Sequence, residues 1–516
     1  MQDDSLLTVV KRDLSGGINT RQHEQIIVDN QATVLQNIIL DTAGQRSGRA
    51  GATLIETFST SASTGLFGFE PENGTDELLV LNGKNLWYSS TIVSAGFTSA
   101  TAATFTTSLS TTMIKALESD EADVVIVANG TDHCFRMTQA HGWQDLNDGS
   151  TSPPLTTVYT WFRDRLWALK DNKLYYSGAI PVDFSVSFDR SLNYYNIPIG
   201  TEKALLGIRD TGILVGGTDA IWGVNPTITP APATDKPEKL LDIGLIAPLM
   251  IQVGDDAWFL ASDGVRGLFR SQQDKLQGGS QFPLSWNIKD EIDAINWTQA
   301  KTKADGVFFD NKFLITFPSG TSTYNNRIAV AYPALRDSQG LPAWVVFTGL
   351  NIARFSKINV SGEERLYGID ATNGNVYRLM NGTSDNATAI VIQEESRAED
   401  FGKPLQKKYG GEFKIKLVGG TKSGDGTLEV FANADDRGYY RLGTITISDT
   451  GVTYPATFPI TFVEGNELEE QFHLDIPNVG QFKRIKFKIY CNSLDASITI
   501  LESIVTTFLE EYQSED

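Results

Sequence analysis

The residues that most often carry out catalysis or bind metals are few in this sequence and widely separated. The four histidines are His23, His133, His141 and His473. No two of them form an H-E-x-x-H motif or another metal-binding spacing, and a lone histidine is more often structural. Cys134 and Cys491 lie too far apart for a redox or metal motif, so we expect two free thiols in the core. The sequence predicts no metal and no cofactor.

Adjacent carboxylates offer a second route to chemistry, the acid and base pair of a glycoside hydrolase. Such neighbours occur as Asp255-Asp256, Asp290-Glu291 and Asp435-Asp436. On strands, adjacent side chains point to opposite faces, so these pairs are not expected to flank one bond. The stretch Asp449–Tyr454 resembles part of the Asp-box turn of sialidases but occurs only once. A nucleophile elbow, a phosphate-binding loop and a dinucleotide fingerprint are all absent from the sequence, so we expect no enzyme.

The net charge of the chain limits the kinds of partner that it can bind. The 516 residues include 43 basic and 63 acidic side chains, a formal net charge of −20. Because affinity for nucleic acid comes largely from lysine and arginine at phosphates, tight binding to DNA is not expected. No window of about 18 uninterrupted apolar residues is present, and the first five residues are polar. We therefore expect no membrane insertion and no export signal.

The elements that would position any site follow one repeated pattern. Glu77–Tyr88 contains a short apolar run, an Asn-Gly turn and a second run of β-forming residues, which together predict a β-hairpin. Six further copies occupy Val124–Phe135, Arg165–Tyr176, Gly212–Trp222, Ala257–Phe269, Val307–Ile315 and Arg365–Tyr377. The spacing of about 45 residues is typical of propeller blades. The sequence predicts an all-β fold with a β-propeller of about seven blades, six to eight, over 63–384.

Two further segments of the predicted propeller differ from the repeated hairpin. The run Trp344–Phe347 could be an outer strand or part of a further blade. Apolar residues spaced by about 3.6 over Leu284–Trp297 predict a short amphipathic helix between blades, with Ser285 as its cap.

The two ends of the chain lack this period. Residues 1–62 are expected to be an N-terminal arm, in which Ala32–Leu40 begins as a helix and ends as a strand. Arg46 and Arg49 lie among glycines; they are either turn residues or surface partners of the acidic excess, or part of an arm that docks on a partner. Residues 385–516 are expected to form an antiparallel β-sandwich-like domain. Alternation in Phe482–Ile489 predicts buried Ile485, Phe487 and Ile489, opposite a basic face formed by Arg484, Lys486 and Lys488.

The N-terminal segment also resembles a known family. A Gly-Gly pair, an Asp-Asn-Gln shortly before a short helix, an asparagine, a turn and an Arg-x-Gly precede the propeller. The residues concerned are Gly16, Gly17, Asn19, Asp29, Asn30, Gln31, Asn37, Gly44, Arg49 and Gly51. This opening is similar to that of bacteriophage tail nozzle and head-to-tail stabilisation β-propeller proteins of short-tailed phages. One departure is Gln25-Ile26-Ile27, where related openings often carry proline.

The resemblance implies a structural virion protein at the tail or portal vertex, assembled in the host cytoplasm. It implies a homo-oligomeric ring, a hexamer in this family, that extends the DNA exit channel. Partners would be portal or adaptor proteins, tail fibre or plug proteins, and phage DNA that passes through without specific binding. Candidate docking residues are Asp29, Asn30, Arg46, Arg49, Arg484, Lys486 and Lys488. The alternative is a propeller at the tail tip that recognises the receptor by binding or cleaving glycans.

Overall fold

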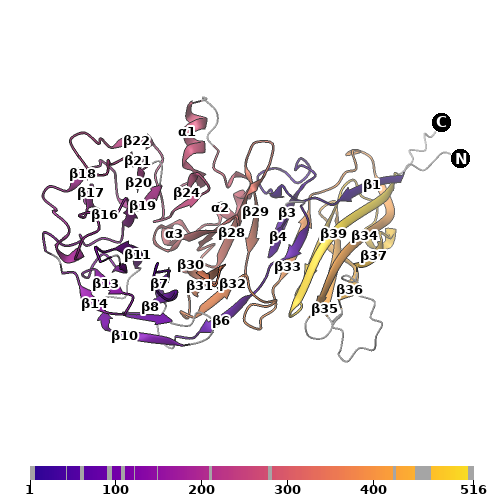
Figure 1. Ribbon diagram of the computed structural model, residues 1–516. Coiled ribbons are helices and arrows are strands. Elements are labelled where there is room, and N and C mark those ends of the chain that lie inside the picture. Colours follow the sequence, from indigo (N-terminus) through magenta and orange to yellow (C-terminus); the bar gives the residue numbers. More distant parts are fainter. Residues whose placement is uncertain are drawn as a thin grey trace, which may run out of the picture.

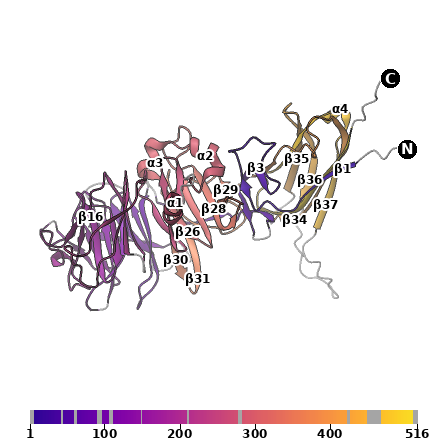
Figure 2. The same cartoon turned by 90° about the horizontal axis from the view of Figure 1, so that it is seen from above.

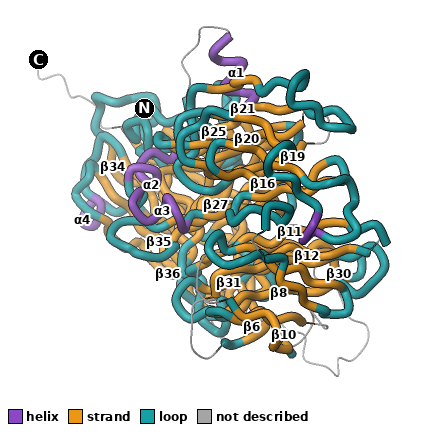
Figure 3. Tube along the Cα trace, turned by 90° about the vertical axis from the view of Figure 1, so that its left-hand side faces the viewer, coloured by secondary structure: helices purple, strands orange, loops and turns teal. Residues whose placement is uncertain are grey.

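The computed structural model describes residues 6–41, 44–58, 63–89, 96–105, 111–120, 122–147, 149–208, 212–276, 282–421, 426–447 and 467–509. The molecule is elongated, with a propeller at one end and a β-sandwich at the other (Figure 1). The first and last described strands, Leu6–Lys11 and Ala496–Leu509, lie at the sandwich end, as the view from above also shows (Figure 2). Strands make up most of the fold, and the helices are short (Figure 3).

The propeller has seven blades: six are small antiparallel sheets, and one is formed by four strands of a larger sheet. Blades one and two comprise β7 (Ser63–Phe69), β8 (Glu77–Asn82), β9 (Asn85–Ser89), β10 (Phe97–Thr104), β11 (Thr112–Leu117), β12 (Asp123–Ala128), β13 (Phe135–Thr138) and β14 (Trp143–Asp145). Blades three and four comprise β15 (Tyr159–Phe162), β16 (Arg165–Lys170), β17 (Lys173–Tyr176), β18 (Tyr194–Asn196), β19 (Glu202–Ile208), β20 (Gly212–Gly217), β21 (Ile221–Val224) and β22 (Glu238–Leu241). A short 3₁₀ helix, η1 (Phe184–Val186), precedes β18.

Blade five has three strands, β23 (Met250–Val253), β24 (Asp256–Ala261) and β25 (Gly264–Gly267), followed by α1 (Leu268–Leu276). The elements η2 (Trp286–Ile288), α2 (Lys289–Asp293) and α3 (Trp297–Lys303) lead into blade six. Blade six comprises β26 (Asp305–Phe309), β27 (Lys312–Phe317), β28 (Arg327–Arg336) and β29 (Pro342–Phe347). Blade seven combines β30 (Ile352–Val360), β31 (Glu363–Asp370) and β32 (Val376–Leu379) with β6 (Ala52–Glu56).

The ring is closed. The first strands of successive blades pack against one another from β7 through β11, β15, β19, β23 and β26 to β30, and β30 packs back onto β7. The second strand of a blade is buried on both faces, as in β12 and β20, because blades cover it from both sides. This explains why the repeated hairpins read as apolar runs and not as alternating patterns. The predicted fold class, a propeller of about seven blades with a C-terminal sandwich, is confirmed.

Several finer expectations change. The sixth hairpin is offset, because β26 and β27 are the first two strands of their blade and not its middle pair. The run Trp344–Phe347 belongs to β29, the outer strand of blade six. The helix predicted over Leu284–Trp297 is present as η2 and α2, but Ser285 does not cap it. Its hydroxyl instead accepts a hydrogen bond from the Val265 N–H at 2.9 Å.

The sandwich consists of two sheets that extend into the N-terminal segment. One sheet contains β37 (Glu467–His473), β34 (Lys408–Thr421), β39 (Ala496–Leu509), β5 (Arg46–Gly48), β4 (Ile38–Leu40) and β1 (Leu6–Lys11). The other contains β33 (Ile392–Ser396), β38 (Ile485–Cys491), β35 (Gly426–Ala434) and β36 (Tyr439–Ile447). The short helix α4 (Ile476–Val479) leads from β37 towards β38. As expected, Ile485, Phe487 and Ile489 face the core.

The N-terminal segment connects the two ends of the molecule. Strand β3 (Gln31–Gln36) lies between β29 of blade six and β33 of the sandwich, and β2 (Gly17–Ile18) pairs with β3, so one ten-stranded sheet runs from propeller to sandwich. The helix expected at the start of Ala32–Leu40 is therefore wrong. The whole stretch is extended except at Asn37, where φ is 55°. Neighbouring strands on both sides supply backbone partners that a helix there would leave unpaired.

The predicted boundary between arm and propeller also differs from the structure. Strand β6 lies within residues 1–62, yet it pairs with β32 as the fourth strand of blade seven. Closing a ring with strands from both ends of the chain buries an edge that would otherwise stay open. Residues 1–62 therefore contribute strands to the propeller, the joint and the sandwich.

Candidate functional site

The most distinctive part of the molecule is the joint where the N-terminal segment meets blade six and the sandwich. Gly17 has φ of +68°, and a Cβ atom there would lie 2.6 Å from the Trp344 nitrogen, so a side chain cannot fit. The side chain of Asn19 donates a hydrogen bond to Gln31 Oε1 at 2.8 Å. A Cβ at Gly51 would lie 2.0 Å from the Ser384 carbonyl oxygen. These residues allow the backbones of distant segments to approach closely.

Asn37 joins three segments at the centre of this region. Its backbone N–H donates to the Val346 carbonyl at 2.8 Å, and its Nδ2 donates to the Val391 carbonyl at 2.7 Å. Its Oδ1 accepts from the Thr348 N–H at 2.8 Å and from Arg49 Nε at 2.9 Å. Asparagine tolerates the left-handed backbone better than most residues, which suits this position. Asn37 thus fixes blade six, the segment before β33 and Arg49 relative to one another.

Arg46 and Arg49 are not the partner-docking residues that the sequence suggested. Arg49 is 2% exposed and forms two hydrogen bonds to Asp385, with N–O distances of 2.8 and 2.5 Å. The side chain of Arg46 is fully buried, and its Nε lies 2.9 Å from Glu394 Oε2. Both guanidinium groups neutralise carboxylates of this same chain, because an unpaired charge in such a site would be costly. Neither is accessible to another molecule.

Asp29 and Asn30 occupy the rim of the joint. Asp29 is 85% exposed and forms an ion pair with Arg397, which in turn binds Glu399. Asn30 donates to the Ser15 hydroxyl at 3.4 Å, and its carbonyl accepts from the Gly16 N–H. The carboxylate of Asp29 remains open to solvent, and its role towards a partner stays a prediction.

Alternation predicted a half-exposed strand with a basic face, and in the structure the side chains of that face contact other parts of the same chain. Arg484 forms an ion pair with Asp436. Lys486 lies 2.9 Å from Glu24, in the N-terminal segment, and 3.5 Å from Asp436. Lys488 lies over the rings of Phe431 and Tyr439, at 4.7 and 4.4 Å from their centroids. The signs of charge were correct, but the acidic partner is intramolecular.

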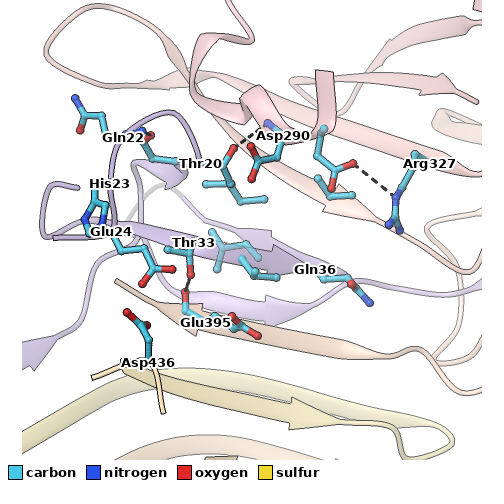
Figure 4. A pocket seen from close by; sticks show the side chains of 16 residues that line it. Thr20, Gln22, His23, Glu24, Thr33, Gln36, Asp290, Arg327, Glu395 and Asp436 are labelled. Carbon is cyan, nitrogen blue, oxygen red and sulfur yellow. Dashed lines mark hydrogen bonds and ion pairs between the residues drawn. The ribbon is translucent and has the colours of Figure 1, made fainter. Parts of the chain in front are cut away.

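A cleft of about 570 Å³ opens where the propeller, N-terminal segment and sandwich meet (Figure 4). Its walls come from residues 18–24, strand β3, helix α2, β28 and the sandwich. Five carboxylates line it, together with one arginine and one histidine: Glu24, Asp290, Glu291, Glu395, Asp436, Arg327 and His23. The Asp290 N–H donates to the Thr20 hydroxyl at 3.1 Å, and the Thr33 hydroxyl donates to the Glu395 carbonyl at 3.1 Å. These bonds hold its walls together.

The carboxylates of the cleft differ in their surroundings. Burial raises the pKa of Glu291, and the Arg327 guanidinium 3.6 Å away only partly offsets this effect. Glu395 accepts a hydrogen bond from the Tyr439 hydroxyl at 2.8 Å. The pKa of Tyr439 is raised, first by burial and second by the negative charge of Glu395. A carboxyl group whose pKa is raised by burial can act as an acid.

The sequence did not indicate this cleft, because its walls come from segments hundreds of residues apart. One expectation about it was also wrong. Asp290 and Glu291 are on helix α2 and not on a strand, and both line the cleft. The helical spacing of the surrounding apolar residues was the signal that could have revealed this.

In the part of the chain that the structure describes, His141 and the two cysteines that the sequence offered as candidates have structural roles. His141 stacks on Tyr88, and its Nε2 lies 2.9 Å from both oxygens of Glu77, whose pKa burial raises. Cys134 and Cys491 are buried and form no disulfide. In that described part, no group of three or more His, Cys, Asp or Glu side chains has the geometry of a metal site. None of its helices is long and apolar enough to cross a membrane. Asp449–Tyr454 lies outside the described residues.

No family model and no curated protein matches the chain. Among solved structures, the AfRom2 CNH domain matches with 12% identity and a TM-score of 0.37, covering 64% of this chain and 99% of that one. An exo-β-1,3-galactanase from Phanerochaete chrysosporium with β-1,3-galactotriose matches in two structures at 7% identity, with TM-scores of 0.25 and 0.26. These cover 89% of this chain and 99% and 100% of the galactanase chains. Similarity at this level says nothing about activity.

Proposed function

We propose that this chain is a structural protein of a tailed bacteriophage virion, one subunit of a ring that completes the head-to-tail junction or forms the tail nozzle. The observation that supports it is the position of the residues that carry the N-terminal resemblance. Gly17, Asn19, Asn37, Arg49 and Gly51 all lie at the joint, where they hold the propeller and sandwich together. The part of the chain that resembles the phage proteins is thus the part that sets its overall geometry.

The proposed mechanism is mechanical and electrostatic. Blades five to seven and the sandwich share one hydrophobic core through the N-terminal segment, so this part of the subunit is a stiff building block. Copies arranged around a channel, six in the family it resembles, would contact portal or adaptor proteins on one side and fibre or plug proteins on the other. The net charge of −20 would repel DNA phosphates, so the genome would pass without sticking.

The decisive experiment is to locate the protein. Tailed particles from a host that carries the coding sequence should contain it at fixed stoichiometry by mass spectrometry. Antibody labelling should place it at the tail or portal vertex in electron micrographs. Its absence from purified particles would overturn the proposal.

A second candidate is glycan binding or cleavage, and the cleft is the observation that favours it. Glu291, whose pKa is raised by burial, would act as the acid, with the other carboxylates of the cleft beside it. Host surface polysaccharide incubated with the protein should then release fragments, and Glu291→Gln should abolish the release. Arg336→Gln, outside the cleft, is the matched control. Intact polysaccharide with the unaltered protein would exclude cleavage.

A further inference from the structure

Among the described residues, β1 is an edge strand of the sandwich. Within the described residues, β1 pairs only with β39, in a register from Leu6 opposite Phe508 to Lys11 opposite Ser503. Its exposure alternates, so that Leu6 and Val10 are 54% and 44% exposed, whereas Val9 packs on the core and Lys11 binds Glu399 at 2.6 Å. The strand LLTVVK is apolar and β-forming and lacks proline or an acidic residue. Uncovered strands of this kind readily add another strand.

The opposite edge of the same sheet is also available. In the part of the chain that the structure describes, β37 pairs only with β34. This strand begins with acidic residues, Glu467, Glu469 and Glu470, and the last two are exposed. By contrast, β1 ends on Lys11 and is followed by Arg12, whose side chain forms an ion pair with Glu502 at 2.8 Å and is still 73% exposed. The sheet therefore has one basic and one acidic edge.

Strand direction shows how two such edges could meet. Strands β37, β34, β39 and β1 are antiparallel in succession, so β1 and β37 run in opposite directions. A second copy in the same orientation would place its β37 antiparallel to β1, the ordinary geometry of strand addition. That alignment brings the basic end of β1 towards the acidic start of β37. Pairing of β1 with another β1 would place the same basic end against Leu6, with no acidic residue in either strand.

We infer that copies of this chain associate head to tail, with β1 of one copy adding to the β37 edge of the next. The contact is heterologous, because different surfaces meet, and repeated contacts of this kind close into a ring when the rotation permits. This inference rests on the proposed function for the ring, but the contact can be tested separately. The sandwich then forms the intersubunit contact, and the propeller remains free for other partners.

Charge reversal provides the first test. In size-exclusion chromatography with light scattering, the unaltered chain should form oligomers, and Arg12→Glu should weaken association roughly fivefold to tenfold through like charges across the contact. Glu469→Lys with Glu470→Lys should do the same, and the triple variant should recover association. Circular dichroism confirms that each variant is folded. A chain that stays monomeric at every concentration overturns the inference, as does an oligomer that no reversal affects.

Cross-linking tests which strands meet and needs no loss of stability. Thr8→Cys mixed with Gln471→Cys should yield an intersubunit disulfide under mild oxidation, whereas Thr8→Cys alone should not. A dimer from Thr8→Cys alone would show pairing of β1 with itself and overturn the assigned contact. A ring that persists without the mixed cross-link would also overturn it while leaving the proposed function intact. Absence of the protein from virions, conversely, would refute the function and leave a positive cross-link standing.

Discussion

The blades of the propeller are held by contacts between residues close in sequence, whereas the joint that attaches the sandwich is held by contacts between residues far apart in sequence. Within a blade, most partners are close along the chain, as in β16 and β17, where Trp167 lies opposite Tyr176. At the joint, Arg49 binds Asp385, 336 residues away, and Lys486 binds Glu24, 462 residues away. A local hairpin can form early at little entropic cost, whereas the joint needs both ends of the chain in place. The repeated elements of the fold therefore depend on local contacts, and the joint, which occurs once, depends on long-range contacts.

Their chemistry differs as well. Blades are held mainly by apolar side chains between sheets, which tolerate exchange of similar residues. The joint uses buried ion pairs, a left-handed asparagine and glycines in close contact with backbone, none of which tolerates exchange. Substitutions of equal size should therefore have unequal effects in the two regions.

The largest effect is expected from Arg49→Ala. Removing the guanidinium leaves Asp385 buried without its partner, which should lower the free energy of unfolding by about 3–5 kcal/mol. Lys289→Ala is the matched control, because it breaks the exposed pair with Asp293 on α2 and should cost only about 0.5 kcal/mol. Urea unfolding followed by tryptophan fluorescence measures both. Equal small losses would show that the joint contributes no more than an exposed helix does.

A glycine pair separates backbone strain from contact. Gly17 and Gly254 have similar φ values, +68° and +61°, but a Cβ would meet the Trp344 backbone at Gly17 and nothing within 4 Å at Gly254. Gly254→Ala should therefore cost only the left-handed backbone penalty, about 1–2 kcal/mol. Gly17→Ala should cost clearly more, because β2 must move away from blade six. Thermal unfolding of the two variants measures the difference. Equal losses would mean that the backbone at the joint yields easily.

The sequence revealed the repeating part of the fold and much less of the joint. The hairpin at Glu77–Tyr88 carries its own turn and apolar runs, so its pairing could be inferred from adjacent residues. The roles of Arg46 and Arg49 could not, because their partners Glu394 and Asp385 follow the whole propeller. Glycine-rich surroundings made the two arginines look exposed, whereas those glycines allow close packing.

The cleft escaped prediction for the same reason. Glu24, Glu291 and Glu395 come from three parts of the chain and share no local pattern. Amphipathic spacing nevertheless located the helix of Glu291, and alternation located the buried face of β38. Patterns that depend on near neighbours were therefore reliable, and the identity of distant partners was not.

The smallest expected effect concerns the pH dependence of stability, to which Glu399 and Glu291 should contribute with opposite signs. Burial opposes the ionisation of Glu399, but Arg397 and Lys11 outweigh it and hold its pKa below the usual value. Its folded-state pKa is thus below its unfolded one, so this contribution to stability is present above about pH 4.3 and is lost as pH falls through the folded-state pKa. Burial instead raises the pKa of Glu291. Its contribution to folding stability is therefore present below the pKa of the unfolded chain and is lost as pH rises through the pKa of the folded state.

Two substitutions test these opposite signs. Glu399→Gln should lower stability at neutral pH and reduce its loss in acid, because a stabilising charge is gone. Glu291→Gln should leave neutral-pH stability equal or slightly higher, because a group that resists ionisation has been made permanently neutral. Chemical unfolding between pH 3 and pH 7, with the unaltered chain as reference, measures both slopes. The two variants should change the slope of unfolding free energy against pH in opposite directions. A change in the same direction would mean that the ion pairs of the joint do not govern its response to acid. The contrast with the apolar propeller would then fail at this point.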